Sequence, residues 1–338
     1  MFFASDNGAP VPKEIMDALM RANTGATLSY GADAPMARLR AQIRALFEAP
    51  EAEVHLVTTG TAANALSLAL YTPPYGAVFC HHHAHIAVDE CGAPEFFSGG
   101  AKLLLCEGPH GKITPDTLET AIAGPDGSVH SVQPSCLSLT NVTETGTVYT
   151  CGEIATLAAL AKSHGLATHL DGARFANALV ATNATPADMT WRAGVDVLSL
   201  GGTKNGLLGV EAVVLFDPAK ARELELRRKR AGHLTSKMRF MAAQMEALFE
   251  NGFWLDLARH ANAMAARIAD GLTNVEGAEL LHPVQANIAF VRLPEAAHAR
   301  AKAAGAVYYD MGGGVGRLVT AWNTTEADVD ALLAAFRG

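Results

Sequence analysis

Short apolar runs alternate with helical patterns along the first two thirds of the chain. Between the runs, alanine and leucine recur at helical spacing, as in Thr61–Tyr71, Thr114–Ala123 and Cys151–His164. Strands that alternate with helices predict an α/β fold, with a mainly parallel, seven-stranded sheet covered on both faces. The predicted strands are Val54–Thr58, Ala77–Cys80, Lys102–Cys106, Ser135–Leu139, Ala167–Leu170, Val195–Leu200 and Ala212–Phe216.

The pattern changes after Phe216. Residues 219–272 are rich in alanine, leucine, arginine and methionine and predict a nearly continuous helix. An α+β pattern follows, with strands at Ala286–Arg292, Val307–Tyr309 and Arg317–Trp322 and helices at Ala296–Gly305 and Thr325–Phe336. We therefore expect a large domain over residues 1–245, including the N-terminal segment, and a small C-terminal domain over residues 246–338.

Composition narrows the class of protein. Of 338 residues, 49% are hydrophobic and 18% charged, which is typical of a folded globular protein. The net charge of -8 argues against binding to nucleic acid or to anionic membranes. The five cysteines form no CxxC pair, Asp6 precedes any apolar leader, and no apolar run approaches membrane-spanning length. These features predict a cytoplasmic protein with reduced thiols.

Lys204 follows the apolar run Val195–Leu200 and two glycines. A lysine at the carboxyl end of a buried strand lies where open α/β sheets bind ligands. Burial lowers the pKa of an amine and makes it a nucleophile toward carbonyl carbons, as in enzymes that form a Schiff base. A surface lysine in a turn is the alternative, and the neighbouring motifs are needed to choose between the two interpretations.

Two motifs supply partners for such a lysine. Asp171 ends the strand Ala167–Leu170, and an aspartate there can hold a proton on a heteroaromatic nitrogen or simply cap the next helix. The run Thr58-Thr-Gly-Thr61 lies between a strand and a helix, and Gly60 allows a tight turn. Free N–H groups at that helix start predict a phosphate site, with an ordinary threonine cap as the alternative.

Three further motifs have less specific explanations. The run His81–His85 holds four histidines that alternate sides along a strand, so we predict no metal site and expect one imidazole to stack on a ring. The basic cluster Leu226–Arg230 predicts a solvated face or a subunit contact, and Gly312–Gly316 predicts a turn. Arg317 after that turn could bind a carboxylate at two points or form a structural ion pair.

Taken in order, these motifs resemble those of a known family. The set comprises Ser5-Asp6, Tyr30-Gly31, Thr59-Gly-Thr61, His85, His169-Leu-Asp-Gly-Ala-Arg174, Lys204 and Arg317-Leu-Val-Thr320. The chain resembles the low-specificity L-threonine aldolases, in the β-eliminating lyase group of enzymes that use pyridoxal 5'-phosphate (PLP) and have fold type I. The likeness covers nearly the whole length.

The resemblance implies a role for each matching residue. Lys204 would form the Schiff base with PLP, Asp171 would pair with the pyridine nitrogen, and His85 would stack on the ring. The backbone of Gly60 and Thr61 would hold the phosphate. Arg174 would bind the phenolate side of PLP and the substrate carboxylate. The remaining expected contacts are Ser5 and Arg317 at the carboxylate, and Tyr30 and Arg239 from a neighbouring subunit, Arg239 at the phosphate.

The chain departs from the family pattern at one point. Many members carry a histidine after the strand Ser135–Leu139 that meets the substrate β-hydroxyl, whereas this chain has Thr143 or Glu144 in that region. The base for the β-hydroxyl is His85, Glu144 acting directly or through a water, or a water alone, and we favour His85. The threo or allo preference stays open.

The resemblance implies reversible aldol cleavage of L-threonine, L-allo-threonine and related β-hydroxy-α-amino acids to glycine and an aldehyde. It also implies a homotetramer built as a dimer of dimers. Alternatives are another PLP-dependent β-eliminating lyase, a racemase, a serine-hydroxymethyl-type aldolase, or a non-catalytic PLP-binding module. The Lys204, Asp171 and Arg317 set argues against the last.

Overall fold

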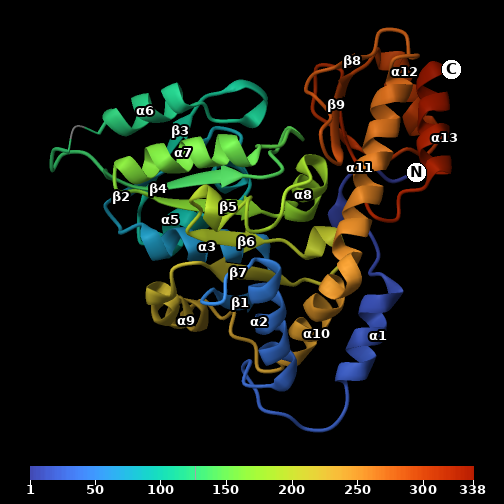
Figure 1. Ribbon diagram of the computed structural model, residues 1–338. Coiled ribbons are helices and arrows are strands. Elements are labelled where there is room, and N and C mark those ends of the chain that lie inside the picture. Colours follow the sequence, from blue (N-terminus) through green and yellow to red (C-terminus); the bar gives the residue numbers. More distant parts are fainter. Residues whose placement is uncertain (126) are drawn as a thin grey trace.

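A computed structural model describes residues 1–125 and 127–338 of the chain (Figure 1). A seven-stranded sheet runs in the order β1-β7-β6-β5-β4-β2-β3. All neighbouring strands pair parallel except β7, which is antiparallel to both β1 and β6. The strands are β1 (Glu53–Val57), β2 (Gly76–His81), β3 (Lys102–Cys106), β4 (Gln133–Thr140), β5 (Ala167–Gly172), β6 (Val197–Leu200) and β7 (Glu211–Leu215). The predicted mainly parallel, seven-stranded sheet is confirmed.

Both faces of this sheet are covered by helices, because side chains along a strand alternate between faces. On β7, Val214 packs on one face and Val213 on the other. The face of Val214 carries α1 (Lys13–Ala22), α2 (Ala34–Leu46), α6 (Pro115–Ala123), α7 (Cys151–Ser163), α8 (Phe175–Thr182) and α10 (Met238–Phe249). The opposite face carries α3 (Gly60–Tyr71), α4 (His85–Val88), α5 (Ala93–Ser98) and α9 (Ala221–Arg230).

A second, smaller sheet lies toward the carboxyl end of the chain (Figure 1). Its strands are all antiparallel, in the order β10-β11-β9-β8. They are β8 (Glu279–Leu280), β9 (Ile288–Arg292), β10 (Tyr309–Asp310) and β11 (Val315–Val319), packed with α12 (Glu295–Ala303) and α13 (Glu326–Arg337). The division of the chain at residue 245 stays a prediction.

The nearly continuous helix predicted over residues 219–272 is wrong. It is three helices, α9, α10 and α11 (Phe253–Leu272). Gly232 lies in the turn after α9 with φ +80°, and Asn251 and Gly252 have φ of +53° and +77° between α10 and α11. Positive φ is incompatible with a continuing right-handed helix, so both junctions break it. Within the described part of the chain, no helix has both the length and the apolarity to cross a membrane.

The first residues of the chain belong to the core of the small sheet. Phe3 is fully buried there, between α11, α13 and strand β11. Its N–H donates to Val307 O at 2.7 Å, and its carbonyl accepts the N–H of Val319 at 2.8 Å. Figure 1 shows the N-terminus beside α13. This anchor fixes the position of the next residues, Ser5 to Asn7, at the junction of the two sheets.

We expect Phe3→Ala to lower the free energy of unfolding by about 3–5 kcal/mol, because it leaves a cavity in a closed apolar core. Phe2→Ala is the matched control, since Phe2 is 53% exposed and should change stability by less than about 1 kcal/mol. Denaturant unfolding measures both. Equal effects of the two substitutions would contradict the anchoring role of Phe3.

Candidate active site

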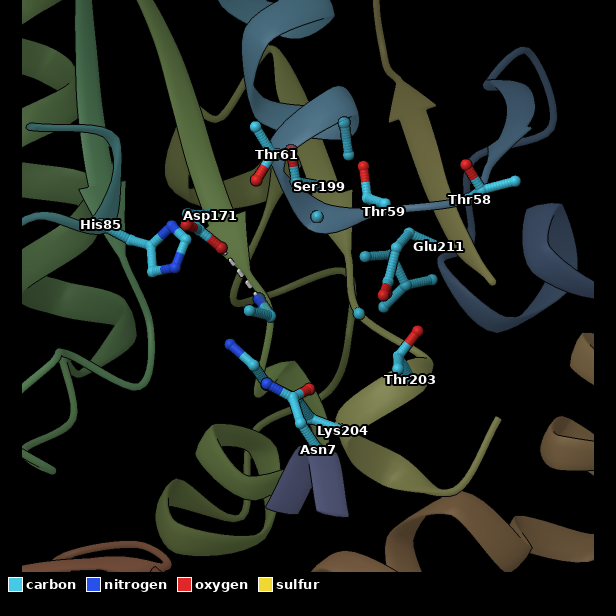
Figure 2. A pocket seen from close by; sticks show the side chains of 15 residues that line it. Asn7, Thr58, Thr59, Thr61, His85, Asp171, Ser199, Thr203, Lys204 and Glu211 are labelled. Atoms are coloured by element: carbon cyan, nitrogen blue, oxygen red, sulfur yellow. Dashed lines mark hydrogen bonds between the residues drawn. The ribbon is translucent and has the colours of Figure 1, made fainter. Parts of the chain in front are cut away.

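Two adjoining cavities lie at the carboxyl ends of the parallel strands, where open α/β sheets bind ligands. The first, of about 300 Å³, extends from the start of α3 to the turn after β6. The second, of about 580 Å³, extends toward the small sheet. Both are lined by Asn7, His85 and Lys204. Figure 2 shows the side chains around the first cavity, with Lys204 below and Asp171 and the start of α3 above.

Lys204 lies on a single helical turn, Thr203–Asn205, directly after β6. The two preceding glycines allow close packing, because a Cβ at Gly201 would meet Ala173 O at 2.3 Å and one at Gly202 would meet Val210 O at 2.5 Å. In the described residues, no hydrogen bond or salt bridge reaches its Nζ atom. Burial, reinforced by the charge of Arg174, lowers the pKa of Lys204 despite nearby carboxylates. The amine is therefore biased toward its nucleophilic form.

Asp171 ends β5 and is buried. Its Oδ1 atom accepts the N–H of Ala173 at 3.0 Å, and its Oδ2 atom accepts Nδ2 of Asn64 at 2.9 Å. Both donors fix the carboxylate plane while the group still lines the first cavity. A fixed, buried carboxylate at this point can hold a proton on a ring nitrogen.

The start of α3 forms the opposite end of the first cavity. The side chain of Thr59 caps the helix by accepting the N–H of Ala62 at 3.1 Å, and Ala63 N donates to Thr59 O. No partner in the described chain receives the N–H groups of Gly60 and Thr61. Unpaired N–H groups at the positive end of a twelve-residue helix suit a phosphate.

His85 is the histidine of the run His81–His85 that lines both cavities. The rings of His81, His82 and His83 pack against one another, with centroids 4.3 and 3.9 Å apart for successive pairs, and His83 also lines the second cavity. Nδ1 of His85 lies 2.8 Å from Oε1 of Glu90, whose side chain is fully buried. This hydrogen bond is the main reason why the pKa of His85 is raised.

Glu144 lies in the loop after β4, the region in which the sequence did not identify the base for the substrate β-hydroxyl. Its Oε1 atom accepts the backbone N–H of His85 at 2.7 Å, and the residue lines the second cavity. Within the described residues its Oε2 atom is buried and has no hydrogen-bond partner of good geometry. Burial raises the pKa of Glu144 to about 7. This carboxyl can therefore change protonation near neutral pH.

Arg174 and Ser5 line the second cavity. Arg174 forms a two-point pair with Asp6, from Nε to Oδ2 at 2.6 Å and from Nη2 to Oδ1 at 2.8 Å. Its Nη1 atom has no protein partner among the described residues. Ser5 caps the first turn by accepting the N–H of Asn7 at 3.2 Å. The arginine is thus oriented by Asp6 and keeps one nitrogen for a ligand.

Arg317, on β11, approaches the same cavity from the small sheet. In the described part of the chain no carboxylate pairs with it, and its guanidinium lies 5.9 Å from the ring centroid of Tyr309. Burial, with the charge of Arg174, lowers its pKa to about 10. Of the two alternatives for Arg317, the structural ion pair is therefore not found among the described residues, and a partly buried cation faces the cavity without a partner anion.

Three predicted site residues do not reach these cavities within the chain. Tyr30 is 49% exposed and lies 5.1 Å from Nζ of Lys229, measured to its ring centroid. Arg239 lies on α10 in a different cavity and donates to Gly25 O at 3.1 Å. Thr143 is fully buried and hydrogen-bonds to the hydroxyl of Thr147 at 2.8 Å. Of the Thr143 and Glu144 pair, only Glu144 lines the cavity.

Sequence reasoning missed several residues around the site. Asn64 and Glu90 form a buried link behind His85 and Asp171. Asp6 orients Arg174, and Glu211 lines the first cavity, where burial raises its pKa. Asn64 stands one helical turn after Gly60 and could have been inferred from that spacing. Glu90 lies in an irregular turn between α4 and α5, so no pattern pointed to it.

Comparison with known proteins identifies the family of this chain. The family model described as β-eliminating lyase matches residues 3–296. A low-specificity L-threonine aldolase from a Pseudomonas species is 41% identical, covering 99% of this chain and 96% of the relative. One from Pseudomonas aeruginosa is 42% identical, covering 95% and 93%.

Solved structures lead to the same family. The threonine aldolase from Leishmania major superimposes with a TM-score of 0.93 at 30% identity, covering 99% of this chain and 98% of that one. The fold class predicted from the sequence and the resemblance carried by the motifs are both confirmed. The chain therefore belongs to the β-eliminating lyase family and, within it, to the group of the low-specificity L-threonine aldolases.

Proposed function

We propose that this chain uses PLP to cleave L-threonine, L-allo-threonine and related β-hydroxy-α-amino acids to glycine and an aldehyde, reversibly. The observation that carries the proposal is the convergence of three groups on one cavity. They are the Lys204 amine, the Asp171 carboxylate and the free N–H groups at the start of α3. The family to which the chain belongs supports the same reaction.

The residues present fit PLP, because each of its polar ends has a complementary group. Gly60 and Thr61 offer unpaired N–H groups for the phosphate. Lys204 offers a buried amine without a hydrogen-bond partner in the described chain for the aldehyde carbon, and Asp171 offers a fixed carboxylate for the ring nitrogen. His85 would lie against the ring. When bound, PLP supplies an electron-accepting ring for the electron pair of the breaking Cα–Cβ bond.

The second cavity would hold the amino acid. Arg317 supplies a partly buried cation that has no carboxylate partner in the described chain. Arg174 supplies its Nη1 atom and Ser5 a hydroxyl, so these three residues would bind the substrate carboxylate. A carboxylate held at two points cannot rotate freely. The clamp would therefore hold the Cα–Cβ bond in the one orientation from which it breaks.

Removal of the β-hydroxyl proton starts the cleavage. His85 and Glu144 both line the second cavity, and the backbone N–H of His85 donates to Glu144. We assign the proton transfer to His85, because its imidazole lines both cavities and the hydrogen bond to Glu90 raises its pKa. Glu144, directly or through a water, is the alternative acceptor.

We also propose a homotetramer, a dimer of dimers, in the cytoplasm. Tyr30 and Arg239 support shared sites, because they lie outside both cavities of their own chain and Tyr30 is half exposed. In this arrangement a neighbouring subunit would contribute them, Arg239 at the phosphate.

The direct test is an assay of the purified protein loaded with PLP. We expect equimolar glycine and aldehyde from L-threonine, L-allo-threonine and phenylserine. Release of ammonia and a keto acid would instead indicate β-elimination, loss of optical activity without cleavage would indicate a racemase, and dependence on a folate would indicate a serine-hydroxymethyl-type aldolase.

Lys204→Ala should abolish both the visible absorption of bound cofactor and the aldol cleavage, because no other amine without a hydrogen-bond partner lines the first cavity within the described residues. Lys102→Ala is the matched control, since Lys102 is an exposed lysine on the edge strand β3. Absorption spectra and aldehyde release measure the two effects. Retained colour with full activity in the Lys204 variant would exclude this assignment.

Asp171→Ala should lower kcat by about 10²- to 10³-fold, the range expected when a preorganised electrostatic partner is removed. KM should change far less, because this carboxylate acts on charge that develops during the reaction. Steady-state kinetics separates the two constants. Asp116→Ala, at an exposed position on α6, should leave both unchanged, and a pure rise in KM for Asp171→Ala would contradict the role.

Glu144→Gln should remove a pH dependence of stability. The folded chain keeps a proton on Glu144 up to a pKa of about 7, whereas the unfolded chain releases it near 4.5, so stability falls as pH rises through that window. The loss above pH 7 is on the order of 3 kcal/mol. Denaturant midpoints at pH 5 and pH 8 measure it. The exposed Glu119→Gln serves as control, and an unaltered pH slope in Glu144→Gln would refute this view.

A further inference from the structure

A buried chain of hydrogen bonds joins the two groups expected to flank the PLP ring. Nδ1 of His85 lies 2.8 Å from Oε1 of Glu90. The same oxygen accepts Nδ2 of Asn64 at 2.8 Å, and Nδ2 also donates to Oδ2 of Asp171 at 2.9 Å. Figure 2 shows His85 and Asp171 on the same side of the cavity. Glu90 and Asn64 stand behind them and line neither cavity.

The charges fix the orientation of each member. A carboxylate only accepts hydrogen bonds, so Nδ1 of His85 carries the proton that points to Glu90. Asn64 is 2% exposed and places both hydrogens of its amide on carboxylates. The flipped amide would set Oδ1 against two anions, which excludes that orientation. One amide therefore holds two buried carboxylates close together by donating to one oxygen of each.

We propose that Glu90 and Asn64 are positioning residues for the aldol cleavage: Glu90 holds the His85 ring with Nδ1 protonated, and Asn64 ties Glu90 to Asp171. This inference rests on the proposed function, because it assigns both residues to that reaction. It adds a fixed link between the group that exchanges the β-hydroxyl proton and the group that holds the ring nitrogen.

The geometry leaves Nε2 of His85 as the reactive nitrogen. Nothing in the described chain hydrogen-bonds to Nε2, and the side chain is 37% exposed while that of Glu90 is 0% exposed. With Nδ1 protonated, neutral His85 presents the Nε2 lone pair to the cavity. A carboxylate behind an imidazole stabilises the imidazolium formed when that lone pair takes a proton.

Several other charged groups face His85 and set the background for its titration. Glu144 accepts its backbone N–H, Asp171 lies at the end of β5, and Lys204 lies after β6. Asp171 raises and Lys204 lowers the pKa of His85, but the hydrogen bond to Glu90 is the largest influence. Removing the charge of Glu90 is therefore the most selective change.

Glu90→Gln removes that charge and keeps an oxygen for the same hydrogen bonds. We expect the pKa of His85 to fall by at least about one unit in the protein without PLP, and NMR titration measures this change. His85→Gln identifies the signal among the 13 histidines. Glu90→Asp keeps a carboxylate at this position, so the pKa of His85 should stay raised in that variant. An unmoved titration in Glu90→Gln would overturn the role of Glu90, whether or not the protein cleaves threonine.

Kinetics of the PLP-loaded protein tests the link to Asp171. Glu90→Gln should shift the acidic limb of the kcat/KM profile to lower pH. Asn64→Leu leaves Glu90 charged, so the His85 pKa should stay raised while kcat falls about 10- to 100-fold. A wild-type kcat in Asn64→Leu, with any effect confined to KM, would overturn the role of Asn64. Absence of glycine release from the unsubstituted protein would instead refute the proposed function.

Discussion

The carboxylate of Asp6 joins the three parts of the chain that build this site. Its two oxygens accept Nε and Nη2 of Arg174 from the end of β5, and Oδ2 also accepts Nδ2 of Asn287 at 3.0 Å from the segment before β9. Burial alone would raise the pKa of Asp6, but the charges and donors of Arg174, Lys204 and Asn287 keep it lowered. A buried carboxylate satisfied in this way is costly to move, because loss of one partner leaves the other charge unpaired. The N-terminal segment, the large sheet and the small sheet thus share one fixed point.

The balance of buried charge follows from that point. Asp6 pairs with two guanidinium nitrogens of Arg174, whereas Arg317 has no carboxylate partner in the described residues. The partly buried guanidinium of Arg317 lies beside the ring of Tyr309. An unpaired cation in a cavity is unfavourable until an anion arrives. A ligand carboxylate removes this unfavourable free energy when it binds, so the unpaired cation contributes to the affinity for such a ligand. Lys204 is a different case, because burial and the charge of Arg174 lower the pKa of its amine and so favour the neutral, nucleophilic form.

Much of this site could be predicted from the sequence because strand ends are local features. Lys204 and Asp171 follow apolar runs, and the parallel sheet brings those ends to one edge. The link through Glu90 could not be predicted, since Glu90 precedes Cys91 at φ +51° in a turn with no periodicity. The prediction of one long helix over residues 219–272 was wrong for a related reason. Its composition favours helix throughout, but Gly232 and Gly252 adopt left-handed backbone that ends each segment.

The loop after β4 explains why the choice between Thr143 and Glu144 needed the structure. The carbonyl of His110 accepts the hydroxyls of Thr145 and Thr147, each at 2.6 Å, and Thr143 hydrogen-bonds to both of these hydroxyls. These contacts turn Thr143 inward, so its hydroxyl serves the loop and not a ligand. Glu144 is then directed to the backbone N–H of His85. The carboxyl of Glu144 therefore ties the loop after β4 to the start of α4 at the edge of the second cavity, and this tether places Glu144 and His85 side by side there.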